Sequence, residues 1–145
     1  MKTRITLFII VLTLAFSVRS LAQDKTYTDG AVWALSFVKT NPGMGVAYIN
    51  SLKSTWKALQ DEAVKQGLIV SYKILDGTAT TPDDYNMILM IEYKNLAAME
   101  GQDAKWDAIQ AKVVGNQDAQ AKLRDVRASQ RTMYGQKTMR EVAYK

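Results

Sequence analysis

The chain has 145 residues, of which 48% are hydrophobic and 23% charged, and its formal net charge is +5 at pH 7. The complete lack of histidine and cysteine excludes disulfide bonds, Ser-His-Asp catalysis, His-ligated haem and most zinc sites. The length predicts one domain with a single hydrophobic core.

The first 22 residues have the three-part pattern of a secretory signal peptide. Lys2 and Arg4 precede an apolar stretch over residues 5–16, and the sequence Ser20-Leu21-Ala22 supplies a small-residue cleavage site. The apolar stretch is shorter than the ~20 residues that a membrane-spanning helix needs. We therefore expect cleavage after Ala22, a periplasmic or secreted protein, and no stable membrane insertion after cleavage.

Much of the basic charge lies in this predicted signal. Removing Lys2, Arg4 and Arg19 together with the rest of residues 1–22 lowers the net charge from +5 to +2. Nucleic-acid binding requires a concentrated basic face, and the remaining charges form no such block. We expect no nucleic-acid partner. Residues 23–30 are predicted to be a flexible leader, and residues 31–145 a single domain.

The first predicted strand spans residues 31–40, where bulky side chains at 33, 35 and 37 alternate with smaller ones. The sequence TNPGMG follows, with two glycines one residue apart. A phosphate-binding loop would also need a Gly-Lys-Ser/Thr sequence or a third glycine, and neither is present. The pattern predicts a tight turn in front of a helix, with Asn41 as its N-cap.

A helix is predicted from Val46 to a stop at Gly67, because apolar residues recur at steps of three and four. These residues are Val46, Ile49, Leu52, Trp56, Leu59 and Ala63. Two strands follow, at 68–75 with apolar residues on both faces, and at 85–93 with alternating ones. A short polar loop joins them, which predicts an antiparallel hairpin.

The last third of the chain predicts helical segments and one more strand. Asn95 is placed to cap a short turn, residues 96–100, and Asp103 to cap a helix that buries Trp106, Ile109 and Val113. A polar helix is predicted over 117–134, ending at a glycine, at the edge of the core or against a partner. The final strand is predicted over 138–144.

This order of elements predicts an α+β fold of the ferredoxin-like βαββαβ type. Right-handed crossovers would give a four-stranded antiparallel sheet with helices on one face. A sheet with one face covered would leave several bulky apolar side chains facing water. Exposed apolar patches of more than a few hundred Å² are usually interaction sites. We therefore expect two subunits to pair as a homodimer.

Three stretches carry a family resemblance: YINSLKSTWKALQDEAVKQGLIVSYKIL, YNMILMIEYKN and the closing REVAYK. They resemble the dimeric α/β-barrel superfamily over roughly residues 31–145, and most of all its exported members of unknown function. The resemblance implies two ferredoxin-like subunits with their open sheet faces together. Other members include cofactor-independent monooxygenases, haem-degrading enzymes and lactone isomerases. The predicted polar helix over 117–134 departs from the shortest members.

Four arginines form the first group of candidate site residues. Arg124, Arg127 and Arg131 would share one face of the predicted helix, and Arg140 lies in the last strand. Arg127, Arg131 and Arg140 are ligand-binding candidates, because guanidinium groups bind carboxylates and phosphates. Alternatively, these arginines form a solvated face that pairs with Asp118, Asp125 and Glu141.

Aromatic strand residues form the second group. Trp33, Tyr72, Tyr85 and Tyr93 could line a ligand cavity between sheet and helices or inside a dimeric barrel, or they could be core residues. Glu92 stands in the middle of a strand, on the face opposite Tyr93. In a cavity it would be a candidate acid or base, whereas on a wet surface it would pair with Lys73 or face solvent.

No metal or cofactor is predicted. Met87, Met90 and Met99 could bind Cu(I), but no histidine accompanies them, and they fit better as core residues. The sequence favours a non-enzymatic dimeric domain that binds a small apolar or aromatic ligand or a protein partner. The alternative is a cofactor-independent monooxygenase- or isomerase-like enzyme on a small aromatic or lactone-like substrate, with Glu92, a tyrosine and an arginine as its polar groups.

Overall fold

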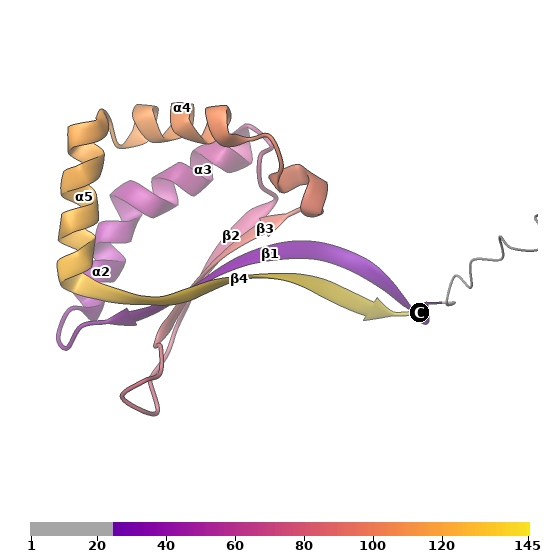
Figure 1. The fold of residues 1–145 in the computed structure, drawn as a ribbon, viewed down its shortest axis with the longest axis horizontal. Helices are drawn as coiled ribbons and strands as arrows, with labels where there is room; N and C mark the ends of the chain where they lie inside the picture. Colours follow the sequence, from indigo (N-terminus) through magenta and orange to yellow (C-terminus); the bar gives the residue numbers. More distant parts are fainter. Residues whose placement is uncertain (1–24) are drawn as a thin grey trace, which may run out of the picture.

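A computed structural model describes residues 25–145, and these form a four-stranded antiparallel sheet with helices on one side (Figure 1). The strands are β1 (Tyr27–Thr40), β2 (Ser71–Asp76), β3 (Met87–Tyr93) and β4 (Arg131–Tyr144). Their order across the sheet is β2-β3-β1-β4. This topology confirms the predicted ferredoxin-like α+β fold. The predicted signal peptide and its cleavage site lie outside the described residues.

The first crossover is a single long helix with an irregular middle. It consists of α2 (Gly45–Leu52), the π-helical turn η1 (Lys53–Lys57) and α3 (Ala58–Lys65). The turn in front of it contains Gly43 at φ 75°, and the carbonyl of Asn41 accepts a hydrogen bond from the Met44 N–H at 2.9 Å. The predicted tight turn is confirmed. Asn41 is not the N-cap, because the helix begins after Met44.

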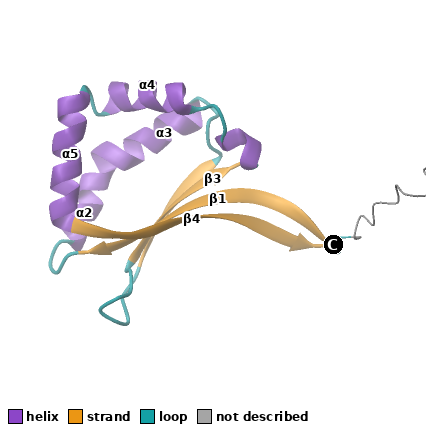
Figure 2. Cartoon of the chain, viewed as in Figure 1, coloured by secondary structure: helices purple, strands orange, loops and turns teal. Residues whose placement is uncertain are grey.

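The second crossover contains the 3₁₀ turn η2 (Leu96–Met99), α4 (Asp103–Val113) and α5 (Gln117–Gln130). The Asn95 and Asn116 side chains cap η2 and α5, as predicted, by accepting backbone hydrogen bonds at 2.9 and 3.0 Å. In Figure 2 all helices lie on the same side of the sheet, with α5 at the end where β4 begins. No helix within residues 25–145 is long and apolar enough to cross a membrane.

The core lies between the helices and one face of the sheet. The fully buried side chains of Val32 and Val38 on β1 and Met87 on β3 point to this side, because Cβ positions alternate along a strand. The residues of the two buried clusters are Val32, Ala63, Leu68, Ile69, Tyr93 and Ile109, and Val38, Tyr48, Leu52, Met87 and Leu89. The predicted inward position of Ile109 is confirmed.

The predicted apolar stripe of the first helix is wrong in its first turns. Val46 is 74% exposed and Ile49 is also exposed, whereas Tyr48 is fully buried beside Leu52. The stripe is right from Leu52 to Ala63, so the error lies within α2. The buried position before Leu52 is four residues back, at Tyr48, whereas the steps of three to Ile49 and Val46 select the exposed side of α2.

The predicted bounds of the N-terminal leader and of the last helix are both wrong. The leader predicted over residues 23–30 is wrong from Tyr27 onward, since β1 begins there and pairs with the end of β4. The predicted polar helix ends at Gln130, and β4 starts at once with Arg131. Gly135, read as a helix stop, lies inside β4 at φ 147°, beside a β-bulge.

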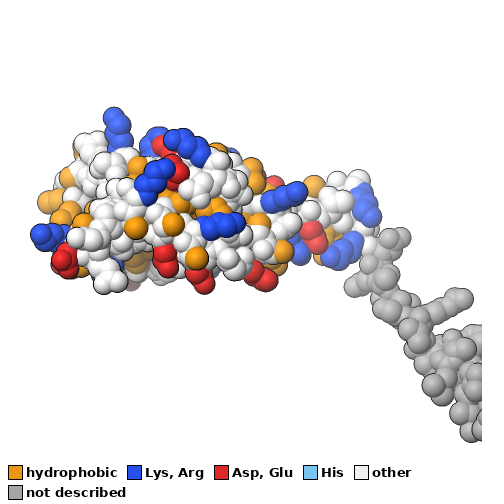
Figure 3. All heavy atoms as spheres, turned by 90° about the horizontal axis from the view of Figure 1, so that it is seen from above, with side chains coloured by type: hydrophobic (Ala, Val, Ile, Leu, Met, Phe, Trp, Pro, Cys, Tyr) orange, Lys and Arg blue, Asp and Glu red, His pale blue; other side chains and the backbone are white. Residues whose placement is uncertain are grey.

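β1 and β4 extend beyond the other two strands as a two-stranded arm. β3 pairs with β1 only from Val32 to Val38, so residues 27–31 pair with β4 alone. The arm projects from the body in Figure 2, and the molecule narrows towards it when seen from above in Figure 3. An isolated two-stranded ribbon is only marginally stable in water. The arm therefore depends on side-chain contacts at its base.

Gly30 makes the closest contact at the base of the arm. It lies at a bulge opposite Glu141, and a Cβ atom on it would meet the Glu141 Cβ at 2.9 Å. We expect Gly30→Ala to lower the free energy of unfolding by ~1–3 kcal/mol, the usual cost of overpacking. Urea unfolding followed by circular dichroism would measure it.

Gly45→Ala is the matched control for this substitution. The added Cβ would meet only the Thr40 Oγ1 atom at 3.7 Å, an ordinary contact, and Gly45 is the first residue of α2. Alanine is the better helix former, so stability should be unchanged or raised by up to ~1 kcal/mol. Equal effects of the two variants would contradict the close contact at Gly30.

Candidate functional site

The face of the sheet without helices, called here the open face, carries large apolar residues from all four strands. Register and side-chain alternation place these residues on it: Trp33, Leu35, Phe37, Leu75, Ile88, Met90 and Met139. Leu75 is 49% exposed and Met139 is 55% exposed. No helix in the described part of the chain lies over this face (Figure 1). The predicted uncovered apolar face is confirmed.

Polar groups collect at one end of the open face, around Trp33. The Trp33 indole N–H donates to Glu141 Oε1 at 2.6 Å, and the Lys73 Nζ lies 5.0 Å from the centre of the indole ring. The Ser71 hydroxyl donates a short hydrogen bond to Glu92 Oε2 across the β2–β3 pair. Glu92 is half-buried on this face. The pairing predicted for Glu92 with Lys73 is replaced by the contact with Ser71.

Tyr85 lies at the opposite end of the open face. Its ring packs against Phe37 with 4.7 Å between the ring centres, and the Lys137 Nζ lies 5.7 Å from the Phe37 ring. Two lysines therefore lie over aromatic rings of this face, one at each end, at distances typical of cation–π contacts. The open face is apolar in its middle and has charged groups at both ends.

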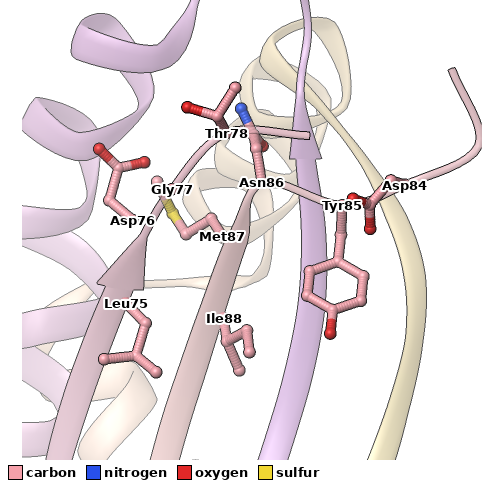
Figure 4. Close-up of a pocket in the computed structure, with 9 residues that line it drawn as sticks. All are labelled: Leu75, Asp76, Gly77, Thr78, Asp84, Tyr85, Asn86, Met87 and Ile88. Carbon is pink, nitrogen blue, oxygen red and sulfur yellow. The ribbon is translucent and has the colours of Figure 1, made fainter. Parts of the chain in front are cut away.

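Tyr85 also lines a pocket of about 240 Å³ at the β2–β3 loop (Figure 4). Asp76 and Asp84 lie on opposite sides of this pocket. Asp84 accepts hydrogen bonds from the Thr80 N–H at 3.0 Å and the Thr80 hydroxyl at 3.1 Å, and these bonds hold its pKa below the usual value. Its carboxylate thus stabilises the loop. Among the described residues no three acidic side chains group as metal ligands.

Tyr72 and Tyr93 lie on the helix side of the sheet, away from Glu92. Tyr93 is 8% exposed in the core, and burial raises its pKa. The Tyr72 hydroxyl donates a short hydrogen bond to Asp61, and its ring meets Trp56 edge-on with 5.4 Å between centres. Both tyrosines therefore belong to the packing between sheet and helices.

The arginines do not share the predicted helical face. Arg131 is the first residue of β4 instead of a residue of α5, and Arg140 pairs with Asp29 at 3.1 Å near the arm. Arg127 Nη2 donates to Thr55 Oγ1 at 2.8 Å, and the Arg131 guanidinium carbon lies 5.7 Å from the centre of the Tyr48 ring. Arg127 and Arg131 therefore converge on α2 and η1.

A second pocket, of about 310 Å³, lies on the helix side near β4. The small side chains of Ala34 and Ser36 leave space there, and Met99 of η2 and Gln136 of β4 border it. The side chains of β4 beyond Arg131 are exposed, so the helices leave this edge of the sheet uncovered. The lining is mixed and its one ionisable residue is Lys137.

The candidate residues are thus divided among four places, of which Arg140 beside Asp29 near the arm is one. Trp33, Glu92 and Tyr85 lie on the open face, Tyr72 and Tyr93 lie in the core, and the pair of Arg127 and Arg131 lies where α5 meets α2. Glu92 and this arginine pair are on opposite sides of the sheet. Within residues 25–145 of one subunit, no carboxylate, arginine and tyrosine of the predicted set converge in a cavity.

Sequence reasoning missed Glu141, Ser71 and Tyr48 as members of these clusters. Glu141 could have been found, because alternation in the last strand puts it on the same face as Met139. Ser71 follows from the hairpin register once Glu92 is chosen. Tyr48 was missed because the predicted stripe steps back from Leu52 by three residues to Ile49, whereas Tyr48 lies four residues before Leu52.

Asp61 positions Tyr72 and also pairs with Lys57 at 2.7 Å. The bonds from Lys57 and Tyr72 hold the Asp61 pKa below its ordinary value of 3.8. The ionised carboxylate thus stabilises the fold above the unfolded-state pKa, and this contribution is lost as pH falls through the folded-state pKa. We expect Asp61→Asn to cost ~0.3–1 kcal/mol at neutral pH, as for exposed ion pairs.

The pH dependence separates this effect from a general loss of packing. At acidic pH, below the lowered pKa of Asp61, the difference in stability between wild type and Asp61→Asn should shrink, because the carboxylate becomes protonated. Urea unfolding at both pH values measures it, with Asp107→Asn, at an exposed position on α4, as control. A pH-independent difference would contradict the role of the ionised carboxylate.

Comparisons with known proteins add little to this description. No family model matches the chain, and no curated protein matches it. Among solved structures, the chain is similar to a dimeric ferredoxin-like protein from an uncultured marine organism, with 13% sequence identity and a TM-score of 0.46. The match covers 81% of this chain and 90% of that one. The fold assignment of this chain rests on its own strand order.

Proposed function

We propose that the protein is an exported homodimer whose two subunits pack their open faces together. The dimer would be a non-enzymatic domain that binds a small apolar or aromatic ligand, or a protein partner, in or beside the space between the sheets. The observation that carries the proposal is the uncovered apolar surface of β1, β2, β3 and β4 on this face. Export to the periplasm or the medium is supported by the signal-like pattern of residues 1–22.

The energetics favour a second copy as the occupant. A typical interface removes ~800 Å² of surface from each partner. At ~25 cal/mol/Å² the apolar part of such an area is worth several kcal/mol, although ordering the two subunits offsets part of this gain. The remainder is large beside a total domain stability of ~5–15 kcal/mol. A sheet with one bare apolar face is thus more stable when paired.

The charges of the open face also suit pairing with a copy of itself. Lys73 and Lys137 supply positive groups, and Glu92 and Glu141 supply negative ones, around the apolar middle. A twofold interface brings the same patch from both subunits together, so a patch of one sign would repel itself. Because this patch carries both signs, lysines of one subunit can approach carboxylates of the other.

The position of Glu92 on the open face is also compatible with one enzymatic alternative. Glu92 is half-buried beside Trp33, and a second subunit over this face would remove more water from its carboxylate. A carboxylate that is positioned beside a bound substrate can act as a general acid or base. A cofactor-independent monooxygenase- or isomerase-like reaction on a small aromatic or lactone-like substrate would then use Glu92. The binding role is preferred, because no arginine or tyrosine of the described chain lies with Glu92 in a closed cavity.

Leu35→Glu tests the proposed interface. Leu35 lies in the middle of the open face, opposite Met90, so the substitution would bury an unpaired charge in each subunit of a dimer. We expect a dimer for the wild type and a monomer for the variant, with a dissociation constant raised by at least ~100-fold. Light scattering and native mass spectrometry of protein purified from its own cell envelope would report both the stoichiometry and any retained ligand.

Val46→Glu is the control, because Val46 is 74% exposed on the opposite side of the molecule. It should leave the dimer intact, and circular dichroism should show native secondary structure for both variants. The proposal fails if the wild type stays monomeric at high concentration or if Leu35→Glu dimerises like the wild type. Loss of a retained ligand on Glu92→Gln, with the dimer unchanged, would place the ligand at the open face.

A further inference from the structure

The geometry points to a second site, separate from the open face, where Arg127 and Arg131 bind a small oxyanion that carries a carboxylate or phosphate group. Arg127 lies in the last turn of α5, and Arg131 begins β4. Both reach towards the first crossover helix, where Tyr48, Ser51 and Thr55 face them. Figure 1 shows α5 beside α2 at this end of the molecule. The site is on the helix side of the sheet.

The charge of this cluster is not balanced by the described chain. Both arginine side chains are half-buried, and the ion pairs within residues 25–145 include neither of them. Burial and the neighbouring Arg131 charge lower the Arg127 pKa, whereas Tyr48 raises it. Two like charges in one partly desolvated place are unfavourable unless an anion joins them.

The hydrogen-bond donors of the cluster also exceed its acceptors. The Nε atoms of Arg127 and Arg131 are both buried and have no hydrogen-bond partner within the described structure. Each guanidinium has five N–H donors, and buried polar groups of native proteins are nearly always satisfied. The oxygens of a carboxylate or phosphate are the acceptors that match a guanidinium fork. A bound oxyanion would supply the missing charge and the missing acceptors together.

The π-helical turn η1 fixes Arg127 in this position. Thr55 lies in η1 and donates its own hydroxyl hydrogen to the Ser51 carbonyl at 2.6 Å, which leaves its oxygen lone pair to accept from Arg127. The Ser51 hydroxyl in turn lies 3.3 Å from Gln130 Oε1 on α5. π-Helical turns are often found at functional sites. Here the turn orders a guanidinium before any ligand arrives, which lowers the cost of binding.

The test compares anions at equal ionic strength on the mature chain. Sodium phosphate and sodium succinate are titrated against sodium chloride, and thermal unfolding is followed for the wild type, Arg127→Gln, Arg131→Gln and the control Arg124→Gln. Arg124 is exposed, one turn earlier on α5. We expect phosphate or succinate to raise the Tm of wild type and Arg124→Gln by a few degrees beyond chloride. The shift should be lost in the other two variants.

The anion that gives the shift identifies the group that the site prefers. Equal shifts in all four proteins, or no shift beyond chloride in the wild type, would overturn the proposal. A direct readout covers the case in which a glutamine variant does not fold. In arginine side-chain NMR of the wild type, the Nε–H signals of Arg127 and Arg131 should move on addition of the anion, and that of Arg124 should not. If the Nε–H signals of both arginines did not shift on addition of the anion, the proposal would also be overturned.

This site is independent of the proposed dimer. The Leu35→Glu variant changes the open face on the other side of the sheet, so it should keep the anion response whether or not it dimerises. Loss of the response in Leu35→Glu would mean that the arginine pair depends on the interface, and the proposal of a separate site would fail.

Discussion

The structure depends on one constraint, which is that a single layer of helices can cover only one face of a sheet. A β-sheet must bury an apolar face against another layer. In this chain the small side chains of β1 face the helices, and its bulky ones, Trp33, Leu35 and Phe37, face the other way. The larger apolar residues are thus placed where the chain itself provides no cover. This distribution is the basis of the proposed pairing with a second subunit.

The second crossover shapes the other unusual features of the fold. α5 ends at Gln130, and β4 begins with the next residue, so β4 has room to extend far along β1. Its side chains beyond Arg131 are exposed, and its outer edge pairs with no strand of the described chain. Exposed strand edges tend to pair with other chains unless they are blocked. Charged residues along β4, such as Lys137 and Arg140, discourage such edge pairing.

Much of the fold could be predicted from the sequence, because its local signals agree with the tertiary structure. The asparagine caps at Asn95 and Asn116, the alternation in β1 and the hairpin of β2 and β3 all depend on neighbouring residues. The errors arose where one residue type has two uses. Gly135 can stop a helix or allow a bulge, and only the pairing of β4 with β1 decides between them.

The candidate site was less predictable for the same reason. Which residues share the open face follows from alternation, so Trp33 and Glu92 could be placed together. The convergence of Arg127 and Arg131 on α2 and η1 could not, because it needs both the end of α5 at Gln130 and the packing of α5 against α2. A π-helical turn leaves no clear signal in the sequence, since it is set by packing.

The pair of Arg127 and Arg131 also bears on the stability of α5. This helix has no fully buried residue, and polar contacts connect it to the rest of the molecule, from Arg127 to Thr55 and from Asn41 to the Ser129 carbonyl at 2.9 Å. A helix held in this way gains little from the hydrophobic effect and opens at low cost. An anion bound between Arg127 and Arg131 would join the end of α5 to the start of β4. Because the opened form lacks the paired guanidinium groups, the anion would favour the closed form by mass action. Ligand binding and the order of α5 would therefore be coupled through one pair of charges.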